Sequence, residues 1–281
     1  MKTLFSVTDF SVSKKEFPLV ECDDCTLRFT QDFPSANSIA PYYQFEEYIS
    51  HTNSNKGIVN QLYRQVRKIT LGQKKNLIQK TTGLSTGKLL DMGSGTGTFA
   101  GYMKKAGWQV TGLEPDEGAR KVAYKEFGVI LSDTNSFFEL APAQFDVITL
   151  WHVLEHVHEL QRYVQQLKKL LKPKGKLIIA VPNYTAEDAN HFGAHWAAYD
   201  VPRHLYHFSP SAMRLLLAKN QLSLETIKPM WFDSFYVSML SSKYKTGKLQ
   251  LLPSIWAGLT SNSKAWRDKE RCSSLIYIAS Y

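Results

Sequence analysis

The chain has 281 residues, and its 34 lysines and arginines against 25 aspartates and glutamates give a formal net charge of +9. This length can bury the core of one α/β domain with a substantial elaboration. No stretch approaches the roughly 20 apolar residues that span a bilayer, so we expect no membrane insertion and a cytoplasmic protein. The charge is compatible with nucleic acid, anionic lipid or a phosphorylated small molecule, and does not choose among them.

The N-terminal part of the chain differs in pattern from the rest. Short β-like runs broken by prolines occupy residues 1–40, and aromatic and aliphatic residues recur at helical spacing over 41–82. We predict that residues 1–82 form a cap on a larger domain, residues 83–281.

Two cysteines of this cap, Cys22 and Cys25, have the spacing of metal ligands. A structural zinc ion takes four ligands, and the only other cysteine, Cys272, is far away in the sequence. We therefore expect no metal at this pair.

The larger domain alternates between strand and helix patterns, which predicts an α/β fold with a doubly wound, mostly parallel sheet. An aromatic-rich, helix-compatible stretch at about 232–270 separates the final strands, 222–230 and 273–280, and we expect it to pack over the substrate side as an insertion. The other expected elements are strands at 88–92, 109–114, 129–132, 145–151 and 175–181 and helices at 98–106, 116–127, 159–171 and, capped by Ser209, 210–219.

The most informative motif is Asp91–Gly97, with the sequence Asp-Met-Gly-Ser-Gly-Thr-Gly, between a predicted strand and a predicted helix. Glycine tolerates positive φ and lets backbone approach a ligand, so the three alternating glycines predict N–H groups offered to a polar cofactor. A plain strand-to-helix connection is the alternative. The next strand ends at Glu114, about 20 residues after the first glycine, which is the spacing of a carboxylate that holds ribose hydroxyls.

Two classes of cofactor, dinucleotides and S-adenosylmethionine, use such an arrangement. A dinucleotide turn has the pattern Gly-x-Gly-x-x-Gly, and here Thr98 stands at the position of the last glycine. Asp91 would repel a pyrophosphate and attract a cationic amine or sulfonium. The charge of the motif therefore favours S-adenosylmethionine.

These residues resemble the first motif of the class I S-adenosylmethionine-dependent methyltransferases, Asp/Glu-x-Gly-x-Gly-x-Gly, and the acidic end of that family's second strand. Residues 145–157 resemble the family's fourth strand and its exit loop, and Ser132-Asp133 its adenine position. The resemblance implies a Rossmann-like sheet with an antiparallel last strand, and S-adenosylmethionine as the cofactor. The cofactor-binding residues it implies are Asp91, Met92, Gly93, Ser94, Gly95, Gly97, Glu114, Pro115, Asp133, Trp151 and His152.

The resemblance also implies a role for each part of this set. The three glycines would pack on the methionine part, with Asp91 near its ammonium group. Glu114 would hold the ribose hydroxyls and Asp133 the adenine. Trp151 and His152 would flank the sulfonium.

The cap carries two further resemblances. The Cys22/Cys25 pair is similar to half of the zinc ribbon found in some such methyltransferases, which implies a degenerate remnant. In capped small-molecule methyltransferases the cap closes over the cofactor, which implies such a place for Tyr42, Tyr43 and Tyr48.

Candidate acceptor-side residues follow the fourth predicted strand. Transfer from an activated sulfonium mainly requires alignment and exclusion of water, and a base only if the nucleophile carries a proton. His152 and His156 are four residues apart and would share a helix face, where Glu155 could orient one imidazole. We predict His152 as the catalytic candidate, because the run around His156 is common in family members of different substrate.

Residues 195–208 bring imidazoles, an arginine and aromatic rings into a predicted loop. Arg203 is suited to clamp a carboxylate or phosphate, and His204, a second catalytic candidate, to take a hydroxyl proton. Surface histidines that cap the next helix are the alternative. A metal bound with Asp200 would lack a convincing third ligand, so no metal is expected. The predicted substrate residues are His195, Trp196, Arg203, His204 and His207.

The sequence therefore predicts a methyltransferase that methylates a small molecule, with oxygen preferred to nitrogen or carbon, and releases S-adenosylhomocysteine. A sugar, a lipid precursor or a quinone-like acceptor fits a pocket enclosed by the cap and the insertion. Two alternatives remain open. The first is an RNA or protein methyltransferase, which the positive net charge supports. The second is a non-catalytic scaffold or sensor that keeps the cofactor fold.

Overall fold

The computed structural model of the chain describes residues 1–43, 58–248 and 250–281. The first of its two compact units comprises residues 1–45, 152–163 and 179–279, and the second comprises 46–151, 164–178 and 280–281. Among the described residues, no helix is both long and apolar enough to cross a membrane. Tyr48, which was expected over the cofactor, lies outside the described residues.

The second unit is built on parallel strands that end at the motifs found in the sequence. Strand β4 (Lys88–Met92) pairs in parallel with β5 (Gln109–Leu113) and β7 (Phe145–Trp151), and β5 pairs in parallel with β6 (Leu131–Ser132). The register places Asp91 beside Gly112 on one side and Thr149 on the other. The helices of this unit are α2 (Ile58–Thr82), α3 (Thr98–Lys105), α4 (Glu117–Phe127) and the short 3-10 helix η2 (Thr134–Glu139).

Strand β8 (Leu171–Pro182) has residues in both units and continues the sheet into the first. The whole sheet has the order β10-β11-β8-β7-β4-β5-β6, with β10 at Ser223–Pro229 and β11 at Ser274–Ser280. It is mostly parallel with one antiparallel strand, which confirms the predicted Rossmann-like α/β fold.

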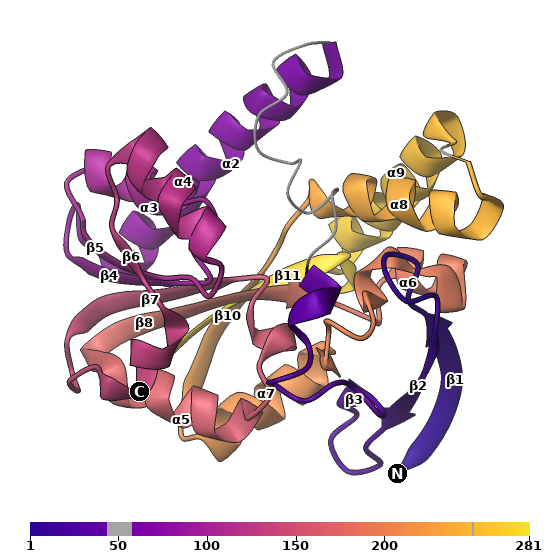
Figure 1. Ribbon diagram of the computed structural model, residues 1–281, viewed down its shortest axis with the longest axis horizontal. Coiled ribbons are helices and arrows are strands. Elements are labelled where there is room, and N and C mark those ends of the chain that lie inside the picture. Colours follow the sequence, from indigo (N-terminus) through magenta and orange to yellow (C-terminus); the bar gives the residue numbers. More distant parts are fainter. Residues whose placement is uncertain (44–57, 249) are drawn as a thin grey trace. The chain divides into compact units, whose positions relative to one another are not determined.

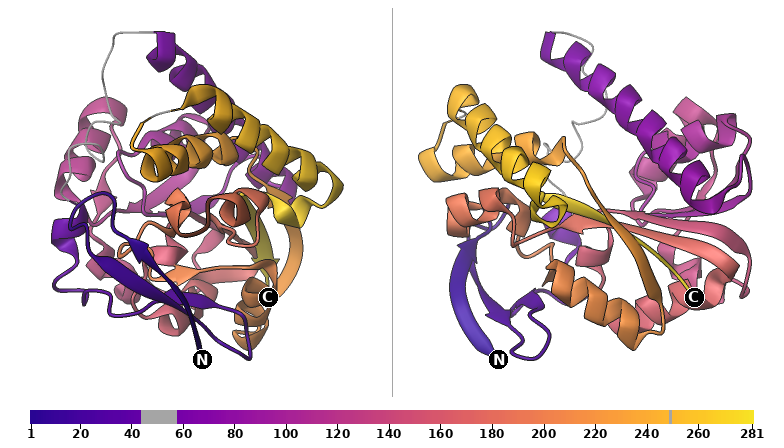
Figure 2. Two further views of the ribbon diagram at one scale, coloured as in Figure 1. Left: turned by 90° about the vertical axis from the view of Figure 1, so that its right-hand side faces the viewer. Right: turned by 180° about the vertical axis from the view of Figure 1, so that it is seen from behind.

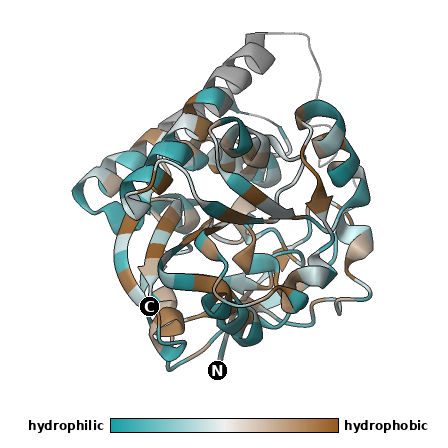
Figure 3. Cartoon of the chain, turned by 90° about the vertical axis from the view of Figure 1, so that its left-hand side faces the viewer, coloured by the Kyte–Doolittle hydropathy of each residue, from teal (hydrophilic) through white to brown (hydrophobic). Residues whose placement is uncertain are grey.

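Continuous apolar runs explain why the central strands form. Leu89, Leu90 and Met92 of β4 are fully buried, and so are Val147, Ile148 and Leu150 of β7. A run buried on both faces is typical of a parallel strand covered by helices. In Figure 3 brown, hydrophobic stretches run along strands near the centre of the view, and teal, hydrophilic residues are prominent on the helices.

One predicted boundary in this region needs correction. The strand expected at 175–181 begins four residues earlier, directly after helix α5 (Leu160–Leu170). Lys174 adopts a positive φ of 66°, and a Cβ on Gly175 would lie 2.9 Å from the carbonyl oxygen of Lys172. The Pro-Lys-Gly sequence therefore bends the beginning of the strand and does not form a separate linker.

The first unit contains a second, antiparallel sheet, with the order β1-β2-β3-β9 (Figure 1). Its strands are β1 (Lys2–Thr8), β2 (Glu16–Glu21), β3 (Arg28–Thr30) and β9 (Tyr206–His207). Because β3 pairs with β9, residues 1–45 group with the C-terminal part of the chain, whereas 46–82 group with the other unit. The predicted division at residue 82 therefore does not coincide with the two units.

Short helices and turns surround this sheet. Ser209 caps α7 (Pro210–Lys219) through a hydrogen bond that its side chain accepts from the backbone N–H of Ala212, as predicted. The remaining elements before it are η1 (Ala40–Tyr43), η3 (Leu154–His156), α6 (Glu187–Phe192), η4 (Gly193–His195) and η5 (Ala197–Tyr199). The segment 195–208, expected as an irregular loop, thus contains 3-10 turns and a two-residue strand, while residues 200–205 belong to neither.

The insertion is helical, as predicted. Helices α8 (Asp233–Thr246) and α9 (Leu251–Arg267) lie side by side (Figure 2) and are followed by η6 (Lys269–Arg271). Their approach is close, because a Cβ on Gly258 would lie 2.8 Å from the ring of Phe235.

Candidate functional site

The glycine turn connects β4 to α3 and leaves the start of α3 without a side-chain cap. Gly93, Gly95 and Gly97 all have positive φ, between 53° and 73°, a conformation that favours glycine. The turn is closed by a hydrogen bond from the backbone N–H of Gly97 to the carbonyl oxygen of Ser94, at 3.0 Å. Uncapped N–H groups at a helix start suit a negatively charged or polar ligand group.

Glu114 is attached directly to this turn. One of its carboxylate oxygens accepts a hydrogen bond from the backbone N–H of Gly95 at 2.7 Å, and the other accepts one from Asp116 at 3.0 Å. The residue is only 6 % exposed, and burial raises the pKa of its carboxyl group although both hydrogen bonds oppose the shift. Each carboxylate oxygen has a second lone pair, so two ligand hydroxyls can still donate to it.

Asp91 is a second buried carboxylate at the turn, 2 % exposed. It accepts a hydrogen bond of 2.8 Å from the hydroxyl of Thr149 on the neighbouring strand. Burial raises its pKa to about 6, against the opposing effects of Thr149, Ser94 and the charge of Lys74. A carboxylate in this state gains from a nearby cation, so it suits the ammonium or sulfonium of S-adenosylmethionine.

Trp151 lies at the end of β7 and already faces a cation. The ammonium of Lys74 is 4.1 Å from the centre of the Trp151 indole ring. Since the face of an aromatic ring attracts positive charge, this position suits the sulfonium that the sequence predicts there. Lys74, on α2, was not predicted from the sequence.

Asp133 is held by Arg120, a residue that sequence reasoning missed. One guanidinium nitrogen of Arg120 donates to the Asp133 carboxylate at 3.0 Å and to the carbonyl oxygens of Glu114 and Pro115. Arg120 thereby joins the ends of β5 and β6, where the ribose and adenine residues were predicted. A basic residue near the start of a helix opposes the helix dipole, and that is the signal that could have revealed it.

The remaining predicted cofactor residues in this unit are part of its framework. Met92 is fully buried, and the hydroxyl of Ser94 donates to the carbonyl oxygen of Asp91 at 2.9 Å. The second unit therefore contains every predicted cofactor residue except His152, which belongs to the other unit.

His152 has a positive φ of 58° and lies between two carboxylates of the first unit. Its Nε2 is 2.9 Å from Asp233, and its Nδ1 is 3.4 Å from Glu155. Burial alone would lower its pKa, but the charge and hydrogen bond of Asp233, together with Glu155, raise the pKa to about 10. A protonated imidazole cannot accept a proton, so in this arrangement His152 is a hydrogen-bond donor and does not suit the role of base.

His204 and His156 form an edge-to-face pair with ring centres 4.6 Å apart. His204 is buried, and its Nδ1 is bonded to the carbonyl oxygen of Ala198 at 2.8 Å. Burial lowers the pKa of His156 to about 4, so this imidazole stays neutral. The structure thus adds His156 and Glu155 to the surroundings of a predicted catalytic residue.

The other predicted substrate residues are engaged in packing. The indole N–H of Trp196 donates to Asp188 at 2.9 Å, and Arg203 pairs with Asp200 through two nitrogens. Their roles in substrate binding remain predictions. His207 is bonded to Thr30 and is buried, and the ring centre of His195 is 5.9 Å from that of Phe10.

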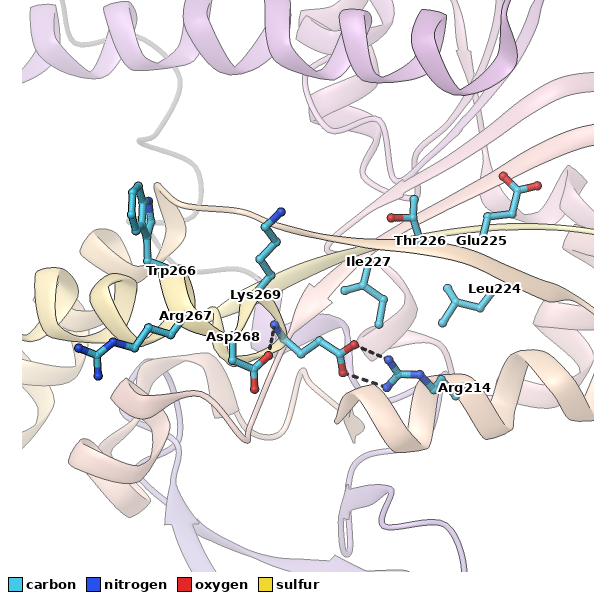
Figure 4. A pocket seen from close by; sticks show the side chains of 10 residues that line it. Arg214, Leu224, Glu225, Thr226, Ile227, Trp266, Arg267, Asp268 and Lys269 are labelled. Atoms are coloured by element: carbon cyan, nitrogen blue, oxygen red, sulfur yellow. Dashed lines mark hydrogen bonds and ion pairs between the residues drawn. The ribbon is translucent and has the colours of Figure 1, made fainter.

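A surface pocket of about 590 Å³ lies elsewhere in the first unit, between α7, β10 and the end of α9 (Figure 4). Arg214 and Glu270 form an ion pair across it, with one N–O distance of 3.0 Å. Because it contains none of the predicted site residues, we do not assign the cofactor or the acceptor to it.

Comparison with known proteins places this geometry in context. A family model described as "Methyltransferase domain" matches residues 63–227. The chain is 38 % identical over 119 residues to the ubiquinone biosynthesis O-methyltransferase of Actinobacillus pleuropneumoniae serotype 7, which covers 38 % of this chain and 50 % of the relative. The chain thus spans about half the length of the curated relatives that it matches.

Solved structures share the fold at low sequence identity. A S-adenosylmethionine-dependent methyltransferase from Archaeoglobus fulgidus has a TM-score of 0.52 and 17 % identity, covering 76 % of this chain and 94 % of that one. The 1,6-didemethyltoxoflavin-N1-methyltransferase of Burkholderia thailandensis, crystallised with 1,6-didemethyltoxoflavin and S-adenosylhomocysteine, has a TM-score of 0.51 and 14 % identity. This match covers 99 % of this chain and 98 % of that one.

Proposed function

Because a family match over more than half of its length means that the chain belongs to the methyltransferase-domain family, we propose that it transfers the methyl group of S-adenosylmethionine to an oxygen atom of a small molecule. The main support for this cofactor is a hydrogen bond inside the glycine turn, which the Glu114 carboxylate accepts from the backbone N–H of Gly95. This bond fixes the ribose-binding group relative to the methionine-binding turn. S-adenosylmethionine is the cofactor that both motifs serve.

The second unit supplies the chain's own contribution to cofactor binding. Asp91 attracts the ammonium, the face of Trp151 attracts the sulfonium, and Glu114 accepts from the ribose hydroxyls. Asp133, positioned by Arg120, lies at the end of the next strand and takes the adenine amine. The activated methyl group then needs only an aligned nucleophile and a site without water.

Oxygen is proposed as the acceptor atom because the matched relatives are named as O-methyltransferases. Since that name places them in ubiquinone biosynthesis, a hydroxyl on a quinone-like ring is the first class of acceptor to test. His152, His195, Trp196, Arg203, His204 and His207 remain the proposed acceptor-side residues. A cytoplasmic location is part of the same proposal.

The test is an acceptor screen with the purified full chain. We would measure release of S-adenosylhomocysteine with quinol, catechol and sugar hydroxyls, and with RNA, in parallel with Asp91→Asn as a cofactor-site control. Acceptor-dependent release with a small hydroxyl compound, lost in the variant, is expected. Release with RNA alone would replace the proposal by the nucleic-acid alternative, and cofactor binding without release for any acceptor would favour a scaffold or sensor.

A further inference from the structure

Glu155 is a carboxylate buried inside the first unit. It is 0 % exposed, and neither of its carboxylate oxygens accepts a hydrogen bond of good geometry from the described part of the chain. The Nδ1 of His152 lies 3.4 Å away, and the other ring nitrogen of His152 bonds to Asp233 at 2.9 Å. A buried carboxylate without hydrogen bonds costs free energy unless a charge or a metal compensates it.

Two imidazoles lie around this carboxylate. Glu155, His156 and His204 each offer one ligand atom, and the three atoms lie within 4.8 Å of one another. Glu155 and His156 come from η3, directly after β7, and His204 comes from the segment between η5 and β9. All three belong to the first unit, so the cluster is part of one compact body.

The hydrogen bonds behind the two rings orient them for coordination. The Nδ1 of His204 is 2.8 Å from the carbonyl oxygen of Ala198, and the Nδ1 of His156 is 3.0 Å from the carbonyl oxygen of Arg203. A carbonyl can only accept, so each Nδ1 carries the proton and each Nε2 keeps its lone pair. The Nε2 of His204 also lies 3.8 Å from a carboxylate oxygen of Asp200, beyond hydrogen-bond distance. An Nδ1–H bonded to a carbonyl, with Nε2 as the ligand atom, is the usual support of metal-bound histidine.

We propose that Glu155, His156 and His204 bind a divalent transition-metal ion, with zinc as the first candidate. Two imidazoles and one carboxylate are a ligand set of zinc and of non-haem iron, and three protein ligands leave a coordination position open. The sequence did not predict this site: the only ligand considered with the histidines was Asp200, and no metal was expected. In the structure Asp200 pairs with Arg203 and lies 3.8 Å from the Nε2 of His204.

The proposal goes beyond methyl transfer, so its test reads metal binding and not activity. We would remove metal from the full chain with a chelator, titrate it with Zn²⁺ by calorimetry, and measure bound zinc by mass spectrometry. One zinc ion per chain is expected. Glu155→Gln, which keeps the shape of the side chain, and His204→Gln should each weaken binding more than about 100-fold, because loss of a ligand exceeds the 10–100-fold effect of removing an outer partner.

Two matched controls exclude other ligands. Cys22→Ser with Cys25→Ser tests the only cysteine pair of close spacing, and His191→Gln tests an exposed histidine. Both should bind zinc like the wild type, and Co²⁺ bound to the wild type should lack the charge-transfer absorption of thiolate ligands.

Tyr43→Phe removes the hydroxyl 3.1 Å from the Nδ1 of His156 and tests the site without removing a ligand. It should weaken zinc binding about tenfold, the lower end of the effect of removing an outer partner, and an unchanged affinity would count against the site.

Circular dichroism on every variant separates loss of a ligand from loss of the fold. Folded Glu155→Gln and His204→Gln variants that keep full zinc affinity would overturn the proposal. So would a metal-free wild type that binds no zinc, or zinc binding that disappears in the cysteine variant. If the two ligand variants do not fold, the thiolate-free Co²⁺ spectrum and the Tyr43→Phe affinity decide the matter.

Discussion

The carboxylate of Glu114 accepts a hydrogen bond from the backbone N–H of Gly95 at 2.7 Å, and this bond joins the end of β5 to the turn after β4. Two features 19 residues apart in the sequence therefore form one rigid element. The backbone holds the carboxylate in place before any ligand binds, which reduces the entropy that cofactor binding must overcome.

Glu114→Ala should weaken binding of S-adenosylhomocysteine by about 1–3 kcal/mol, because ribose hydroxyls and the N–H of Gly95 both lose an acceptor. Calorimetric titration measures the change. The matched control is Glu117→Ala, three residues further on, where an exposed carboxylate pairs with Lys121 on the surface. An affinity for Glu114→Ala equal to that of the control would remove Glu114 from the site.

The glycines of the turn should respond differently to substitution. A Cβ on Gly97 would lie 2.5 Å from the Cβ of Ala123, whereas a Cβ on Gly95 has open space around it. Both have positive φ, so Gly95→Ala should cost about 1 kcal/mol of folding stability and Gly97→Ala about 1–3 kcal/mol more. Chemical denaturation measures both, and equal losses would contradict the packing argument. Gly95→Val should in addition abolish cofactor binding in a folded protein, because its side chain would occupy the space that the ligand needs.

The main elements could be predicted because their signals are local. The strand that ends at Met92 and the helix capped by Ser209 each follow from apolar runs and capping residues close in sequence, and the structure confirms them. Long-range contacts were not predictable in this way. Strand β9 has only two residues and carries no periodic signal, yet its pairing with β3 decides which unit the N-terminal residues join.

In the candidate site, too, local sequence signals were predictable and long-range contacts were not. The cofactor residues were found because a glycine pattern and a carboxylate spacing report on backbone geometry. Arg120 and Lys74 were missed because their importance depends on where helices α4 and α2 lie. Glu155 and His204 are far apart in the chain, so nothing in the sequence brings them to one cluster.

Cofactor binding should depend on pH through Asp91. Burial raises its pKa to about 6 in the folded chain, with Lys74 opposing and Glu114 reinforcing the shift. Below that pH the group is neutral and cannot attract the ammonium of the cofactor, so affinity should be about tenfold lower at pH 5 than at pH 7.

The same shift acts on folding with the opposite sign. Since the folded pKa lies above the ordinary aspartate value of 3.8, the contribution of Asp91 to stability is complete below about pH 4 and is lost as the pH rises through 6. Asp91→Asn should bind S-adenosylhomocysteine more weakly at pH 7 and lose most of the pH dependence of binding. Any pH dependence of binding that remains in this variant would come from Glu114. An unchanged pH profile in Asp91→Asn would show that Asp91 is not the titrating group.

Arg203 tests whether a predicted substrate residue acts on the fold instead. Its guanidinium is buried, pairs with Asp200 and donates to the carbonyl oxygen of Tyr42 and to the hydroxyl of Ser11, both from the N-terminal segment. Arg203→Ala would leave the half-buried Asp200 carboxylate without its guanidinium partner, with only the imidazole of His204 at 3.8 Å among the described residues, which should destabilise the protein by about 3 kcal/mol. Arg203→Lys keeps the charge but loses the planar two-nitrogen contact, so it should recover only part of that loss.

Denaturant unfolding of both variants, together with KM for the acceptor found in the screen, separates the two roles of Arg203. Stability close to wild type with a raised KM would assign Arg203 to the substrate, whereas a large loss of stability with KM unchanged in Arg203→Lys would assign it to the contact between the N-terminal segment and the 200–207 region.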